Sequence, residues 1–305
     1  MEVFIEFKGQ RLAVDSLGGG IKSYYVHKDG ERRDIIYGYR DIEAKDGCMG
    51  DVLSPFPGRM VDDEYEWQGT KYVIAEELKL NGRALHAFVD QFEWRVEKIS
   101  DSIIQATFQT EQRFSDKGFP FNLEYKVEYS IGEDGLTVET KVKNVGKTTA
   151  PFGIGYHPYF AVTEAVDAAE WRVPAKKVVE FDESLKPTGR LLSVGEANLD
   201  FREFSAIGDK IIDNCFFELE RDSQGIFSSV LKNGKTDEKI TIWQDEAYPY
   251  FQTYSSDTIK SEHHRKAMAL EPQSCCGFAI NMPELGLIAL KSGEEFKGSW
   301  GVKID

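Results

Sequence analysis

The sequence predicts an all-β protein folded as one large antiparallel β-sandwich. Three observations carry this prediction: apolar and polar residues alternate at two-residue spacing, turn-forming clusters separate the alternating segments, and few windows show the period of an amphipathic helix. No internal repeat, low-complexity tract or linker rich in Pro, Gly and Ser divides the 305 residues. We therefore expect one domain spanning residues 1–305.

Alternation is clearest in residues 122–129, where every second residue is Leu, Val or Tyr and the others are polar. One face of such a strand packs and the other is polar. Similar strands are expected at 104–110, 136–142 and 240–243, and Gly-rich turns at 132–135 and 232–235 indicate hairpins. The best helical window is short and lies at 196–204. The run Gly18 to Gly20 lacks GxGxxG spacing and a following helix, so it predicts a tight turn rather than a phosphate loop.

Composition excludes several classes of function. The chain has 37 Lys and Arg against 52 Asp and Glu, a net charge of −15, which would repel nucleic acid and anionic membranes. Its first residues do not resemble a signal peptide, and no apolar run approaches the roughly 20 residues of a membrane span. We expect a cytoplasmic protein with reduced cysteines, either a monomer or a homodimer. We also expect no metal site, because neither the four cysteines nor Glu262-His263-His264 has a metal-ligand pattern.

The most distinctive segment surrounds His157, in Gly-Ile-Gly-Tyr-His157-Pro-Tyr-Phe. Gly153 and Gly155 allow close approach of the backbone, and Pro158 biases His157 towards an extended conformation. The imidazole is thereby held at a fixed angle. A packed, hydrogen-bonded core histidine would have the same pattern, so the residues alone leave a catalytic and a structural reading open.

A second segment places a carboxylate, Glu271, directly after an apolar stretch and before Pro272. Desolvation of a carboxylate at such a position raises its pKa, which suits a general base, although a solvated strand-end Glu is equally compatible. Arg59 in Pro-Phe-Pro-Gly-Arg and His86 in Ala-Leu-His-Ala-Phe add polar groups in turn-rich, apolar surroundings, where either residue could also be structural.

Taken together, these segments resemble the aldose 1-epimerase (galactose mutarotase) family. His157-Pro-Tyr-Phe is similar to the family's Gly-x-x-x-His-Pro-Tyr-Phe signature, and Leu-Glu271-Pro-Gln273 with Asn281 to its C-terminal catalytic stretch. Further matches in family order are Pro-Phe-Pro-Gly-Arg59, Leu85-His86, Ile212-Asp213-Asn-Cys-Phe and the strand Tyr248 to Tyr254. The resemblance implies a galactose mutarotase-like β-supersandwich with its site in a cleft on one sheet.

The resemblance also implies roles for the matching residues. Glu271 would be the general base and His157 the general acid, with His86 as a further histidine of the catalytic site. Sugar-binding residues would be Arg59, Asp213 and Gln273. Such a protein interconverts the α and β anomers of a free aldohexose and needs no cofactor, and its partner is the small-molecule sugar itself.

The chain departs from the family pattern in two places, and two rival functions stay open. Ala87 and Phe88 follow His86 where the family has glycines. In the segment Pro-Phe-Pro-Gly-Arg59, which we call the arginine loop, Pro57 stands where a small residue is common. We therefore expect a changed pocket wall. One rival is a sugar-6-phosphate 1-epimerase, which would need a basic cluster such as Arg32-Arg33 or Arg265-Lys266. The other is a non-catalytic sugar-binding protein, for which the pair Glu271 and His157 would be unnecessary.

Overall fold

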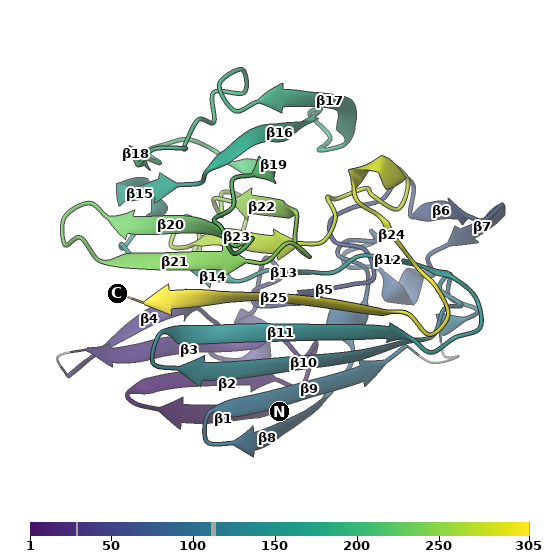
Figure 1. Ribbon diagram of the computed structural model, residues 1–305, viewed down its shortest axis with the longest axis horizontal. Helices are drawn as coiled ribbons and strands as arrows, with labels where there is room; N and C mark the ends of the chain where they lie inside the picture. The colour runs from purple at the N-terminus through teal and green to yellow at the C-terminus, as the bar shows by residue number, and fades with distance from the viewer. Residues whose placement is uncertain (29, 111–113, 305) are drawn as a thin grey trace.

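The computed structural model describes residues 1–28, 30–110 and 114–304 and is built almost entirely of antiparallel strands. Its two large sheets are shown in Figure 1, where the long strands β25, β11 and β10 run side by side. Within the described ranges, the larger sheet has 12 strands in the order β1-β2-β3-β4-β14-β23-β22-β19-β16-β17, with β13 and β5 attached beside β23. Their bounds are β1 Glu2–Phe7, β2 Gln10–Asp15, β3 Ile21–Lys28, β4 Glu31–Tyr37, β5 Val52–Leu53, β13 Gly155–Tyr156, β14 Tyr159–Phe160, β16 Ala175–Phe181, β17 Pro187–Ser193, β19 Asp213–Leu219, β22 Tyr250–Tyr254 and β23 Met268–Gln273.

The second sheet has nine strands in the described chain, in the order β18-β15-β20-β21-β25-β11-β10-β9-β8. Two small two-stranded pairs complete the strands: the hairpin of β6 with β7, and β12 paired with the distant β24. The bounds are β6 Glu64–Trp67, β7 Thr70–Val73, β8 Arg95–Ser100, β9 Ile103–Gln109, β10 Leu123–Gly132, β11 Gly135–Asn144, β12 Ala150–Phe152, β15 Ala169–Arg172, β18 Ser205–Ala206, β20 Phe227–Asn233, β21 Lys239–Gln244, β24 Ile288–Leu290 and β25 Glu295–Ile304.

The expected strands are confirmed, because residues 104–110, 122–129, 136–142 and 240–243 fall in β9, β10, β11 and β21. The best helical window, 196–204, is not helical: residues 196–198 form a turn, with Asn198 in the left-handed region at φ 56°, and 199–204 are irregular. Helical segments of the described chain are single 3₁₀ turns, namely η1 Ile42–Ala44, η2 Glu76–Leu78, η3 Val89–Gln91, η5 Val166–Ala168 and η6 Pro283–Leu285. Gly18 and Gly19 make the predicted tight turn, both at positive φ.

The core lies between the two sheets. Buried side chains of both sheets form one continuous cluster, and polar groups cross the interface in pairs. The Tyr129 hydroxyl donates to the Gly19 carbonyl at 2.6 Å, and the Tyr248 hydroxyl donates to Thr140 Oγ1 at 3.0 Å. Each buried hydroxyl therefore finds a partner across the core, as burial requires. The opposite face of the 12-stranded sheet is left to carry the site.

Candidate active site

The candidate site lies at the centre of the 12-stranded sheet, on the face turned away from the core. Along β23, Met268 and Leu270 join the core cluster between the sheets. Because successive side chains of a strand point to opposite faces, Glu271 and Gln273 point outward. Gln252 on the neighbouring β22 is paired with Glu271 and lies on the same face.

These side chains line a cavity of about 180 Å³. All six residues predicted from the sequence, namely Arg59, His86, His157, Asp213, Glu271 and Gln273, contribute to its wall. Other lining residues are Gly47, Cys48, Gly58, Leu85, Tyr159, Phe181, Leu185, Gln252, Tyr254, Thr258, Ile259, Gly277 and Phe278. The structure thus brings together segments that are more than 200 positions apart in the chain.

His157 sits in the short break between β13 and β14, both of which pair with β23. Its backbone N–H donates to the Asp51 carbonyl at 3.0 Å, and its carbonyl accepts from the Gly50 N–H at 2.9 Å. The predicted close approach of the preceding glycines is confirmed, because a Cβ on Gly155 would lie 2.8 Å from Gln273 Cγ. The backbone hydrogen bonds of His157 and the close contact of Gly155 therefore fix the position of the imidazole. Its ring stacks on that of Tyr159, with ring centroids 5.0 Å apart.

Glu271 is almost fully buried, with 1% of its surface exposed. Its Oε2 accepts a hydrogen bond from Gln273 Nε2 at 2.9 Å, and its Oε1 lies 3.5 Å from His157 Nε2. Two buried atoms beside this pair, His157 Nδ1 and Gln273 Oε1, have no hydrogen-bond partner among the described residues. Buried polar atoms are normally satisfied, so two unpaired atoms side by side mark this place as a candidate functional site.

Burial sets the protonation state of the pair. Desolvation, helped by the charge of Asp213, raises the pKa of Glu271 well above its ordinary value. Desolvation, helped by the charge of Lys45, lowers the pKa of His157 to about 3. Both shifts disfavour the charged forms, so burial favours a neutral carboxyl group and a neutral imidazole over the ion pair.

His86 is held by the arginine loop. Its Nδ1 accepts from the Gly58 backbone N–H at 3.0 Å, which leaves Nε2 as the protonated nitrogen of the neutral ring. Burial and the charges of His157 and Arg59 lower the pKa of His86 well below its ordinary value. His86 is therefore a neutral hydrogen-bond donor, with its ring 5.4 Å from that of His157.

Asp213 begins β19 at the other end of the cavity. Its Oδ1 accepts from Gln252 Nε2 at 2.8 Å. Burial raises the pKa of Asp213, while the Arg59 guanidinium opposes this shift. Carboxylate, amide and guanidinium groups thus face the cavity together, a donor and acceptor set suited to sugar hydroxyls.

The expected change of the pocket wall at Pro57, Ala87 and Phe88 is wrong, because none of them lines the cavity. Ala87 adopts φ 62°, a conformation that glycine takes with less strain. Phe88 is fully buried and packs its ring against Phe114 and Phe119. These positions belong to the core beneath the site.

The resemblance placed the strand Tyr248 to Tyr254 near the pocket without singling out Gln252 or Tyr254, and sequence reasoning missed Thr258 altogether. A signal for the first two existed, since alternation along β22 places Gln252 and Tyr254 on one face. Thr258 lies in a loop, where no periodicity marks it. All four cysteines are described and free, and three are buried, as expected.

Two further features concern metals and membranes. Within residues 1–28, 30–110 and 114–304, no group of three or more His, Cys, Asp or Glu side chains is arranged to hold a metal ion. In the same part of the chain, no helix is long and apolar enough to span a bilayer.

The two packed sheets, with a cavity on one of them, have a galactose mutarotase-like fold. An aldose epimerase homologue from C. elegans superposes with a TM-score of 0.85 at 18% identity, covering 100% of this chain and 99% of that one. A galactose 1-epimerase from Lactobacillus acidophilus superposes at 0.80 with 15% identity, covering 100% and 94%.

Sequence comparison then gives the family: the chain belongs to the aldose 1-epimerase family, whose sequence model matches residues 4–303. Escherichia coli strain K12 has a relative, the uncharacterized protein YihR, with 27% identity over 85% of this chain and 80% of that one. The aldose 1-epimerase of Streptococcus thermophilus is 23% identical over 93% of this chain and 88% of that one.

Proposed function

We propose that this protein is an aldose 1-epimerase that interconverts the α and β anomers of a free aldohexose such as galactose or glucose. The observation that supports it most is the Glu271–His157 pair, 3.5 Å apart and buried in a cavity of about 180 Å³. Pockets for drug-sized ligands are larger, roughly 300–1,000 Å³. The cavity therefore suits a single sugar ring.

In the proposed reaction, the anomeric hydroxyl loses its proton to the Glu271 carboxylate while His157 donates a proton to the ring oxygen. The C1–O5 bond breaks, the C1–O1 bond becomes a carbonyl, and an open-chain aldehyde forms. Rotation about C1–C2 and reclosure with the reverse proton transfers give the other anomer. The enzyme ends each cycle with the same single proton on the pair, so no further reactant is consumed.

These roles use the ion-pair form of Glu271 and His157, whereas burial favours the neutral form. The two forms differ only in which partner holds the shared proton. Hydrogen bonds from sugar hydroxyls, together with the Gln273 amide on Glu271, stabilise the carboxylate. Arg59 at the cavity wall stabilises negative charge that develops on oxygen during ring opening.

The charges around the cavity favour a neutral sugar over a sugar 6-phosphate. Arg59 is the one Lys or Arg in the described lining, and it faces two carboxyl groups, Asp213 and Glu271. None of Arg32, Arg33, Arg265 and Lys266 lines the cavity, so neither basic pair could hold a phosphate in the site. With Asp213 and Glu271 in the same lining, this one guanidinium is not the basic cluster that a phosphate dianion would need.

The first experiment is polarimetry of fresh α-D-galactose and α-D-glucose with wild type, Glu271→Gln and the control Glu139→Gln. Glu139 is exposed on β11, in the other sheet. We expect Glu271→Gln to lose about 10²- to 10⁴-fold in rate, since it lacks the base. Glu139→Gln should keep the wild-type rate. Sugar binding without acceleration by wild type, for any aldose tried, would instead favour a sugar-binding protein.

A further inference from the structure

The loop between β22 and β23, residues 255–267, forms one wall of the cavity. It connects the strands that carry Gln252 and Glu271, and its own Thr258 and Ile259 line the cavity. The Thr258 backbone N–H donates to the Tyr254 hydroxyl at 2.7 Å, and the two side-chain hydroxyls are 2.8 Å apart. The position of this wall therefore depends on how the loop is anchored.

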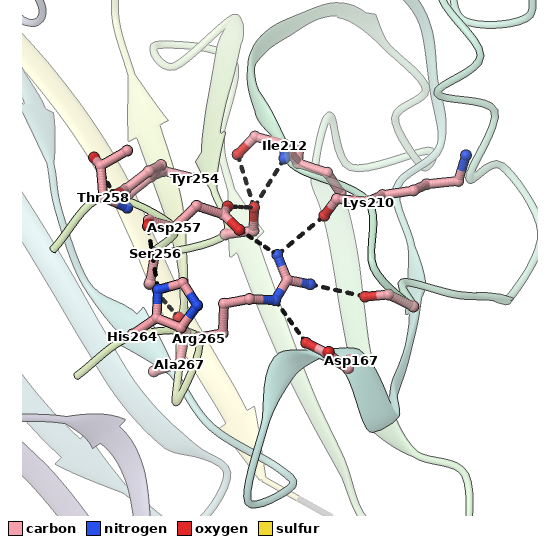
Figure 2. Close-up of polar contacts among 12 residues, drawn as sticks. Asp167, Lys210, Ile212, Tyr254, Ser256, Asp257, Thr258, His264, Arg265 and Ala267 are labelled. Atoms are coloured by element: carbon pink, nitrogen blue, oxygen red, sulfur yellow. Dashed lines mark hydrogen bonds and ion pairs between the residues drawn. The ribbon is translucent and has the colours of Figure 1, made fainter. Parts of the chain in front are cut away.

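Arg265 anchors the β22–β23 loop through its hydrogen bonds and ion pairs, as Figure 2 shows. Its Nε donates to Asp167 Oδ1 and its Nη1 to Asp257 Oδ1, each at 2.6 Å. Its guanidinium also donates to the carbonyls of Gly208 at 2.7 Å and Lys210 at 3.2 Å. All three guanidinium nitrogens are used, and the side chain is 11% exposed. One cation thus ties together η5, the segment before β19 and the β22–β23 loop.

A chain of hydrogen bonds leads from Arg265 to the sugar-binding aspartate. The Asp257 carboxylate, held by Arg265, accepts through Oδ2 from the Ser255 hydroxyl. Ser255 Oγ in turn accepts from the Ile212 backbone N–H at 2.8 Å, and the Ser255 N–H donates to the Ile212 carbonyl at 2.9 Å (Figure 2). Asp213 is the next residue and opens β19 opposite Tyr254.

We propose that Arg265 is a positioning residue for sugar binding, which fixes Asp213 and the Thr258 wall through the Asp257–Ser255–Ile212 chain. The inference rests on the proposed function. Arg265 lines no part of the cavity and touches no reacting group. Its loss should therefore weaken sugar binding while leaving the Glu271–His157 chemistry in place.

Lysine cannot replace this arginine. A planar guanidinium presents five N–H donors in a rigid fork, and Arg265 uses the fork to reach two carboxylates and two carbonyls at once. An ammonium has three donors on a flexible stem and cannot span these acceptors. Arg265→Lys keeps the positive charge but loses the planar arrangement of N–H donors. It therefore separates the positioning role from the effect of charge.

The test compares Arg265→Lys with Arg221→Lys. Arg221 is a matched control, because its guanidinium also binds backbone carbonyls, those of Gly225, Gln244 and Tyr248, none of which lines the cavity. We expect Arg265→Lys to raise KM for the aldose by about tenfold with kcat within about twofold, and Arg221→Lys to leave both unchanged. If Arg265→Lys left KM unchanged and lowered the melting temperature as Arg221→Lys does, Arg265 would have only a structural role.

Two carboxamide variants test the route. In Asp257→Asn, an NH2 donor replaces one of the two carboxylate oxygens that accept from Arg265 and Ser255, so one of these two hydrogen bonds loses its acceptor and KM should rise. Asp167→Asn keeps an oxygen for Arg265 Nε and lies off the chain, so its KM should stay at the wild-type value. Equal effects of the two variants would contradict the proposed route.

A readout independent of turnover separates this inference from the proposed function. Amide hydrogen exchange of wild type and both arginine variants should show faster exchange at 207–213 and 255–262 in Arg265→Lys alone. Unchanged protection in both segments would overturn the positioning role whether or not an aldose is turned over. If Arg265→Lys increased the exchange but the wild type had no epimerase activity, the positioning role of Arg265 would hold and the proposed function would be rejected.

Discussion

At the scale of single residues, the site depends on one proton shared between two buried groups. In water Glu271 would be charged at neutral pH and His157 would titrate near that pH, but burial makes the neutral forms more stable. In the proposed reaction, the active form of the pair carries one proton, because the carboxylate must accept one and the imidazole must donate one. Adding a second proton removes the base, and removing the first removes the acid.

This sharing predicts the pH dependence of the rate. Because the pKa of His157 is lowered to about 3, the pair does not take up a second proton as pH falls from 7 to 5. Because the pKa of Glu271 is raised, the pair loses its proton only when pH rises above that raised value. We expect kcat/KM, corrected for spontaneous mutarotation, to show no loss from His157 protonation between pH 7 and 5 and to fall as pH rises through the raised pKa of Glu271. An acid limb centred near 6.5 would show an ordinary histidine and contradict the shift.

The sequence singled out the residues of the proposed reaction more readily than the residue proposed to position them. Glu271, His157 and Arg59 stand in short local patterns that can be recognised in the sequence alone. Arg265 stands beside Lys266 and looks like part of a solvated basic pair, whereas the fold buries it against Asp167, 98 positions away. Such pairings depend on which loops the fold brings together, and the pKa shifts depend on burial, so neither could be predicted locally.

At the scale of elements, the arginine loop is held by the loop that follows β23. Gly58 adopts φ 74°, and a Cβ there would lie 2.6 Å from Gly277 Cα. The Phe278 N–H donates to the Arg59 carbonyl at 2.8 Å, and Asn281 Oδ1 accepts from the Val61 N–H at 2.9 Å. Asn281, noted in the sequence only as part of the catalytic stretch, therefore fastens the arginine loop to the sheet.

This contact predicts the effect of Gly58→Ala. The methyl group would separate the two loops and displace Arg59, so kcat/KM should fall and stability should drop by about 1–3 kcal/mol beyond the cost of positive φ. Gly69→Ala is the matched control, since Gly69 has φ 78° and nothing within 4 Å of its Cβ position. The control should lose about 1 kcal/mol by urea unfolding and keep its activity. Equal activity in the two variants would mean that this contact does not position Arg59.

At the scale of the whole molecule, the two sheets cannot be separated by cutting the chain. Going from β13 to β25, the chain passes back and forth between the sheets, so neither is a continuous stretch of sequence. In Figure 1 the teal and green segments accordingly appear in both layers. Side chains of both sheets also share one core cluster. These features support the proposal that residues 1–305 form a single domain.

A single domain should unfold in one cooperative step. We expect urea transitions followed by far-UV circular dichroism and by tryptophan fluorescence to coincide. Leu12 in the 12-stranded sheet and Leu136 in the nine-stranded sheet are both buried in the shared core. Leu12→Ala and Leu136→Ala should each cost about 2–5 kcal/mol and shift both transitions together. If Leu12→Ala moved only one of two resolved transitions, the sheets would unfold independently, and the cleft would lie on a sheet that is stable without its partner.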